Sequence, residues 1–240
     1  MRFILSRKGF DSASGGVPSP MTSSSLISLP IPTNRRSETT YEDLGLGAIV
    51  QNATSGKIDA THLCHADPYF VDDRCAFGQT GRPQSHLAKK GVTTGDIFLF
   101  FGLFQASGKP REHWIYGWQR IEQIVLLGEQ PTRDQSPDWL PIQHPHTIGQ
   151  WESNNTLYVG EGRVFSKPAP ELRLTQEGGP LSVWQVPPWL RACGLTFHGD
   201  VKRWLPNDRL QSVARGQEFV CDIGNCQDAK DWLCRILAKP

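Results

Sequence analysis

An apolar run from Ile97 to Phe104 (IFLFFGLF) constrains the fold of this chain more than any other segment. The run is too short to cross a bilayer as a helix, which takes about 20 apolar residues. Its length and phenylalanine content, after the turn residues Gly95 and Asp96, are typical of a strand that is buried on both faces. The sequence therefore predicts a layered fold around a central, mostly buried sheet.

The remaining pattern is that of a mixed α/β (α+β) fold. Across 240 residues there is no internal repeat and no linker, so we expect one compact domain spanning residues 1–240. The 23 glycines and 18 prolines favour long functional loops. Further strands are expected at 2–5, 58–65, 114–118, 121–127, 156–159, 172–175, 182–186 and 218–222, and helices at 41–51, 83–90 and 227–239.

Charge and cysteine usage narrow the class of protein. A net charge of +1 argues against coating nucleic acid by charge alone, so any DNA contact needs a local patch. The six cysteines show no CxxC spacing, which favours reduced thiols over a zinc site or a disulfide framework. The first residues lack the apolar length of a signal peptide. We expect a cytoplasmic protein with no membrane partner and no obligatory protein partner.

Two loops carry most of the polar residues that could do chemistry. The first, residues 6–20, combines two basic side chains with glycines and hydroxyls, which suits a phosphate. The second, residues 131–150, is long enough to be functional and contains the sequence His-Pro-His. The residues predicted to bind phosphate, which the resemblance described below assigns to DNA, are Arg7, Lys8, Ser14, Gly15 and Gly16. The other possibility for the first loop is a turn without a ligand.

Asp67 is the leading candidate for a catalytic acid, because it follows an expected strand. A carboxylate there can orient or deprotonate a water, and His144 or His146 can stabilise charge on a departing group. Asp11 is the reserve candidate. The competing structural interpretation is that Asp67 caps a turn and Pro145 shapes a loop.

The sequence also allows two other kinds of site, a metal site and a base-binding site without catalysis. His65, Asp67, Asp72, Asp73, His144 and His146 could hold Mn, Fe or Zn. Their spacing matches no known motif such as HEXXH, so the leading prediction includes no metal and no cofactor. Aromatic residues at strand spacing in 92–101 and 115–118 resemble the barrels of modules that read a flipped base without catalysis. The alternative interpretation is that those aromatic residues only pack in the hydrophobic core.

Short motifs resemble the uracil-DNA glycosylase superfamily. Asp67-Pro68-Tyr69, the strand around 98–102 and His144-Pro145 follow in that order, although His65-Ala66 stands where that superfamily has Gly-Gln. In that superfamily the acid activates water, the aromatic residue lines the base pocket and the His-Pro loop supplies the histidine. The resemblance implies base excision by the same parts.

A wider resemblance covers nearly the whole chain. The motifs at 6–11, 15–20, 65–68, 77–79, 86–87, 95–102, 144–146 and 216–219 resemble the nucleotide modification-associated domain family, third type. That family occurs in phages and bacteria beside enzymes that make or handle hypermodified DNA bases. The resemblance implies that the partner is DNA carrying modified bases. It also implies a pocket formed by Arg7, Lys8, Asp11, Asp67, Gln79, His86, His144 and His146.

The sequence thus leads to one main hypothesis, a glycosylase that removes a hydroxymethylated or glucosylated pyrimidine base from DNA and leaves an abasic site. Phage defence is the plausible role. The expected catalytic residues are Asp67, Asp11, His144 and His146, and the expected base-binding residues are Tyr69, Gln79, His65 and His86. The alternatives are an enzyme that installs or alters a base modification and a non-catalytic reader of modified DNA.

Overall fold

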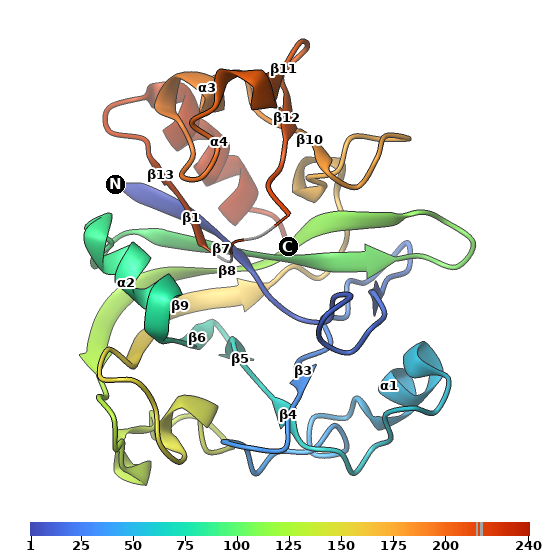
Figure 1. Ribbon diagram of the computed structural model, residues 1–240, viewed down its shortest axis with the longest axis vertical. Coiled ribbons are helices and arrows are strands. Elements are labelled where there is room, and N and C mark those ends of the chain that lie inside the picture. The colour runs from blue at the N-terminus through green and yellow to red at the C-terminus, as the bar shows by residue number, and fades with distance from the viewer. Residues whose placement is uncertain (215, 217) are drawn as a thin grey trace.

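A strongly curved sheet of eight strands runs through the middle of the molecule (Figure 1). The computed structural model describes residues 1–214, 216 and 218–240. The strand order is β13-β1-β7-β8-β9-β6-β5, and β2 also pairs with β7. β7 is parallel to β1 and β2, and the other neighbours are antiparallel. The strands are β1 (Arg2–Arg7), β2 (Ser19–Pro20), β5 (Tyr69–Val71), β6 (Arg74–Gln79), β7 (Ile97–Gln105), β8 (Arg111–Leu126), β9 (Thr156–Val164) and β13 (Glu218–Asp222).

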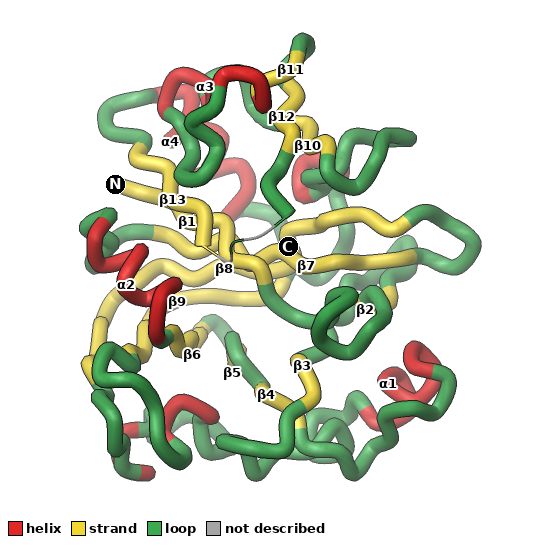
Figure 2. The backbone as a smooth tube through the Cα atoms, in the orientation of Figure 1, coloured by secondary structure: helices red, strands yellow, loops and turns green. Residues whose placement is uncertain are grey.

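Smaller elements surround this sheet, and long loops connect them (Figure 2). A three-stranded sheet contains β10 (Val183–Gln185), β11 (Trp204–Leu205) and β12 (Arg209–Gln211), and β3 (Ile31–Pro32) pairs with β4 (Cys64–His65). The helices are α1 (Gly47–Thr54), α2 (Gly81–Lys89), α3 (Leu190–Cys193) and α4 (Gln227–Leu237), and four 3-10 turns are η1 (Arg133–Gln135), η2 (Pro145–Thr147), η3 (Pro170–Leu172) and η4 (Val201–Arg203). The mixed α/β fold that the sequence predicts is confirmed.

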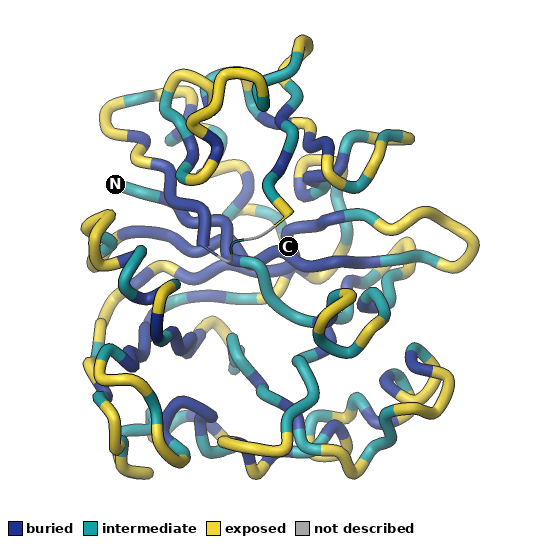
Figure 3. The backbone as a smooth tube through the Cα atoms, in the orientation of Figure 1, coloured by how far each residue is buried: buried dark blue, intermediate teal, exposed yellow. Residues whose placement is uncertain are grey.

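The apolar run forms the centre of the core, as expected. Every residue of β7 except its last is buried (Figure 3). Phe98 and Phe100 pack against Phe77, with ring centroids 4.9 and 5.2 Å away. On the opposite face of the strand, the Phe101 ring packs edge-on against Trp184, with ring centroids 5.3 Å apart. Both faces of the central strand therefore bury aromatic surface.

This packing predicts a large cost for removing one ring. Phe100→Ala deletes a fully buried side chain from the aromatic cluster and should lower the free energy of unfolding by about 3–5 kcal/mol. Urea titration followed by circular dichroism measures the loss. Val201→Ala, at a residue that is 68% exposed, is the control and should change stability by less than about 0.5 kcal/mol. Equal effects for the two variants would contradict the assigned core.

Three predicted elements differ from the structure, each for a local reason. Of 58–65, only Cys64–His65 is strand, because Asp59 forms a side-chain turn by accepting the Thr61 amide. The helix predicted from 41 starts only at Gly47, after a turn in which Gly45 has φ +68°. The predicted strand at 172–175 begins in η3, which starts at a proline. The strands at 114–118 and 121–127, in contrast, join into the single strand β8.

The curvature of the sheet creates the site described below. β6 and β13 are separated by four strands in the strand order, yet Gln79 Nε2 donates to Glu218 Oε1 at 2.7 Å. Lys8, directly after β1, places its Nζ 4.3 Å from the centre of the Phe77 ring on β6. The two sides of the sheet are thus brought together where β1 and β6 end and β13 begins.

Among the residues that the structure describes, none of the helices has both the length and the apolar character needed to cross a membrane. All six cysteines are free thiols.

Candidate active site

Asp67 lies between β4 and β5, and three histidines surround its carboxylate. The side chain is only 4% exposed. Oδ1 accepts the backbone N–H of Gly78 at 2.8 Å and lies 3.4 Å from His144 Nε2. Oδ2 lies 3.7 Å from the Nε2 atoms of both His65 and His146. The structure thus gathers three predicted histidines around the carboxylate of Asp67.

Local hydrogen bonds fix which nitrogen of His146 carries the proton. Asn155 Nδ2 donates to the His146 carbonyl at 2.9 Å, so Asn155 Oδ1 is the acceptor facing His146 Nδ1, 2.6 Å away. His146 Nδ1 must therefore hold the hydrogen. In the neutral ring Nε2 then carries a lone pair, and this lone pair faces Oδ2 of Asp67.

His144 has the opposite tautomer and a different role. Its Nδ1 accepts the backbone N–H of His146 at 3.2 Å, so the neutral ring carries its hydrogen on Nε2, beside Asp67 Oδ1. The side chain is completely buried. His144 therefore positions Asp67 from behind and does not reach a ligand in the cavity.

The ionisation of the cluster follows from this burial and these contacts. Burial by itself raises the pKa of Asp67, but polar contacts with His144 and His65 and the nearby His146 outweigh it and lower the pKa below its usual range. Burial lowers the pKa of His146 to about 3, against the opposing effect of the Asp67 charge. At neutral pH the site thus contains an anionic carboxylate and a neutral His146.

Asp67 and His146 face a cavity of about 410 Å³ at the meeting of the sheet ends. His146 stacks on Trp151 with ring centroids 4.1 Å apart, which forms part of the cavity wall. The lining also includes six further predicted residues and Gly78, from separate parts of the chain. These are Arg7, Lys8, Asp11, Ser14, His65, Gln79 and Gly78.

Glu218 is a central residue that the sequence analysis missed as a site residue. It is 1% exposed, and its Oε1 accepts from Ser6 Oγ at 3.1 Å, Lys8 Nζ at 3.0 Å and Gln79 Nε2 at 2.7 Å. Within the described part of the chain, Oε2 has no hydrogen-bond partner. The available signal was a glutamate opening the buried strand β13, which calls for a cationic partner. Its neighbour Gln217, part of the quoted resemblance, lies outside the described residues.

The basic residues of the first loop are held by the protein itself. Arg7 donates to the carbonyls of Ala214 and Val213 at 3.1 and 3.4 Å, and Lys8 pairs with Glu218. Asp11 Oδ1 accepts the amides of Ala13 and Ser14 and so closes a turn. All three side chains line the cavity. Asp11 therefore both caps the turn at residues 11–14 and lies beside the cavity.

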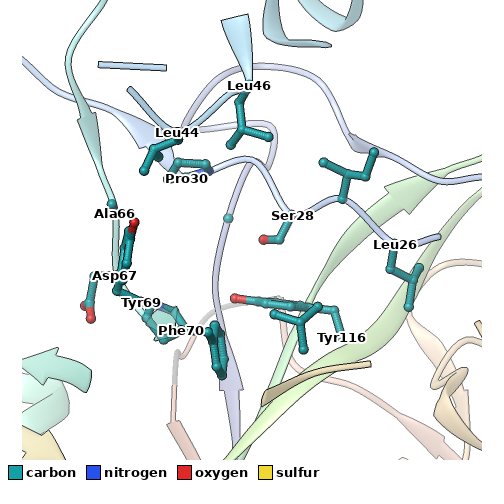
Figure 4. A pocket seen from close by; sticks show the side chains of 14 residues that line it. Leu26, Ser28, Pro30, Leu44, Leu46, Ala66, Asp67, Tyr69, Phe70 and Tyr116 are labelled. Atoms are coloured by element: carbon teal, nitrogen blue, oxygen red, sulfur yellow. The ribbon is translucent and has the colours of Figure 1, made fainter. Parts of the chain in front are cut away.

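Four predicted residues lie away from this cavity. Tyr69 lines a neighbouring apolar cavity of about 350 Å³, from which the Asp67 carboxylate points away (Figure 4). His86 on α2 contacts Thr196 Oγ1 at 3.1 Å and packs on Phe197. Gly15 packs under the Phe10 ring, and Gly16 is open to its surroundings; neither lines the cavity. The order of the motifs along the chain does not indicate which predicted residues line the cavity and which lie away from it.

Gly78 is a sensitive position because the His146 ring lies directly over it. A Cβ placed there would come within 2.2 Å of the ring. Gly78→Ala should displace His146 from Asp67 and destabilise the fold by about 1–3 kcal/mol through overpacking. Thermal unfolding and the His146 ring signals in NMR measure the two effects. Gly199→Ala is the control, because a Cβ at Gly199 would meet nothing within 4 Å. Gly128 also has open space around it, but its φ of +75° would strain an alanine. An unshifted His146 signal in Gly78→Ala would contradict this geometry.

Comparison with known proteins gives one match. A family model described as nucleotide modification associated domain 3 matches residues 2–222. Neither a curated protein nor a solved structure matches the chain. The matched range includes every residue of the cavity described above.

Proposed function

Because this chain belongs to the nucleotide modification associated domain 3 family, we propose that it is an enzyme acting on modified bases in DNA, and specifically a glycosylase. The proposed substrate is a hydroxymethylated or glucosylated pyrimidine, flipped out of the duplex into the cavity. Removal of that base leaves an abasic site. In a cell whose own DNA lacks the modification, such an enzyme would damage invading phage DNA selectively, which supports a role in defence.

One observation carries this proposal: a buried, anionic carboxylate that has one oxygen free of hydrogen bonds from the described residues lines a cavity of about 410 Å³. Oδ1 of Asp67 is occupied by Gly78, whereas Oδ2 accepts no hydrogen bond from the described residues. Such an oxygen can hold a water in a fixed orientation. Asp67 lines this cavity together with His146, His65 and Ser14.

The proposed reaction is hydrolysis of the N-glycosidic bond. The water held at Oδ2 attacks C1′ of the sugar and gives one proton to Asp67. The bond between C1′ and the base nitrogen breaks, and its electron pair leaves with the base, which then takes up a proton. His65, which also lines the cavity, stabilises the charge that develops on the base by donating to it, whereas the lone pair on His146 Nε2 accepts a hydrogen bond from the attacking water. His144 acts as a positioning residue because it is buried behind Asp67.

A set of matched duplexes tests the reaction. The purified protein is incubated with duplexes that differ at one position, carrying cytosine, uracil, hydroxymethylcytosine or glucosylated hydroxymethylcytosine, and the products are treated with alkali. We expect strand breaks only in the duplexes with a modified base. Intact strands on every duplex, with and without added divalent metal, would refute the glycosylase. Retention of modified duplex without turnover would identify a reader instead.

A further inference from the structure

We propose that His65, Asp67 and His146 form a binding site for one divalent transition-metal ion, which the sequence analysis did not predict as its leading hypothesis. One ligand atom from each residue lies within 4.8 Å of the other two. The proposed ligand atoms are Oδ2 of Asp67 and Nε2 of both histidines. The site is the same as that of the proposed function, and this inference deepens that function.

The lone pairs of the three residues are arranged as a cation would require. The Asn155 contact leaves a lone pair on His146 Nε2, and this atom lies 3.7 Å from Oδ2 of Asp67, which is also an acceptor. His65 Nε2 lies at the same distance from Oδ2 on the outer side. A lone pair directed at a buried carboxylate is electrostatically unfavourable unless a positive charge lies between them. A metal cation placed between the three atoms removes this conflict.

The hydrogen bonds that support the three residues are also those of a metal site. Ligating histidines usually donate their other ring N–H to an oxygen, which fixes the tautomer and the ring orientation. His146 does this through Nδ1 and Asn155 Oδ1, 2.6 Å apart. The contacts of Gly78 and His144 are confined to Oδ1 of Asp67, so they orient the carboxylate and leave Oδ2 toward the histidines.

The separations suit a metal without rearrangement of the backbone. Ligands at about 2.0–2.2 Å from zinc lie roughly 3–3.5 Å from one another, so side-chain rotations must close the two 3.7 Å gaps to Oδ2 and bring together the histidine nitrogens, which lie within 4.8 Å of each other. Two imidazoles and one carboxylate favour zinc, iron or manganese over magnesium or calcium. The remaining coordination positions face the cavity, since Asp67, His65 and His146 all line it.

A metal changes the role of Asp67 in the proposed function. Asp67 becomes a ligand instead of the proton acceptor, and the water becomes a metal ligand whose pKa is lowered by the ion. That consequence rests on the proposed function, whereas metal binding itself does not. The two ideas can therefore fail separately.

Titration of the metal-free protein tests the site directly. Isothermal titration calorimetry with Zn²⁺ and the visible absorption of Co²⁺ should show one ion per chain bound through nitrogen and oxygen. His146→Ala should weaken Zn²⁺ binding more than about 100-fold, and Asn155→Ala, which keeps all three ligands, should weaken it about 10–100-fold. His62→Ala is the matched control, because His62 pairs with Asp59 at the surface with 48% of its side chain exposed.

Circular dichroism verifies that each variant is folded before titration. Binding of one ion that is lost in His146→Ala and retained in His62→Ala supports the proposal. Failure of folded wild-type protein to bind Zn²⁺ or Co²⁺, or equal binding by the His146→Ala and wild-type proteins, overturns it. Metal binding without base release on any duplex would remove the glycosylase and leave the metal site standing. Base release by a protein that binds neither Zn²⁺ nor Co²⁺ would overturn the metal site and leave the glycosylase standing.

Discussion

Asp67→Asn should reduce base release from a modified duplex by about 10²–10⁴-fold while leaving the protein folded. The amide has the same shape as the carboxylate, and its oxygen can still accept the Gly78 N–H that binds Oδ1 at 2.8 Å. It lacks the negative charge needed to hold and deprotonate a water, or to bind a metal. Single-turnover assays of free-base release give the rate, and gel shift gives the affinity for modified duplex.

Asp59→Asn is the matched control for that substitution. Asp59 also faces a histidine, His62, at 2.9 Å, but both side chains are about half exposed at the surface. Its rate of base release should equal that of the wild-type protein. If Asp67→Asn retained full activity, the assignment of Asp67 would be wrong, and Asp11, the other acid beside the cavity, would be the residue to change next.

Glu218→Ala should lower the free energy of unfolding by about 3–5 kcal/mol, because it leaves the Lys8 ammonium buried without its counter-charge. Lys8 is 11% exposed, and its nearest compensating contact would be the face of Phe77. Ser6 and Gln79 lose the same acceptor. Chemical denaturation measures the loss, and the cavity should lose its shape because β1, β6 and β13 are no longer tied together.

Glu161→Ala provides the comparison for this effect. Glu161 pairs with Arg120 at 2.8 Å, but both side chains are nearly half exposed, so its removal should cost no more than about 1 kcal/mol. The double variant Lys8→Met with Glu218→Leu removes both charges and should recover part of the stability lost by Glu218→Ala. Equal stability of Glu218→Ala and wild type would show that Lys8 is not held as the structure has it.

The fold was predictable where hydrophobic patterning is strong and local. β7 and α4 could be placed from their apolar residues, because burial on both faces of a strand or on one face of a helix leaves a clear period. Residues 58–63 looked like a strand but form turns, because Asp59 and Thr61 satisfy the backbone with their own side chains. The curvature that joins β6 to β13 depends on contacts between distant residues, which no local pattern reveals.

The site was predictable in its residue types but only partly in its geometry. Asp67, His65 and His146 were all proposed from the sequence, and the structure places them together. The distinction between His144 and His146 depends on Asn155 and on a backbone amide, and these partners cannot be read from the spacing of two histidines. Arg7 and Lys8 were assigned to phosphate as basic loop residues, yet their charges are engaged by carbonyls and by Glu218.

Mass spectrometry of the products from a single duplex tests the central claim most directly. A duplex with one hydroxymethylcytosine, or its glucosylated form, is incubated with the wild-type and Asp67→Asn proteins, and both the free bases and the intact strands are weighed. We expect one free modified base for each abasic site with the wild-type protein, and almost none with Asp67→Asn. Recovery of full-length strands whose modified base is unchanged, or altered but still attached, would contradict it.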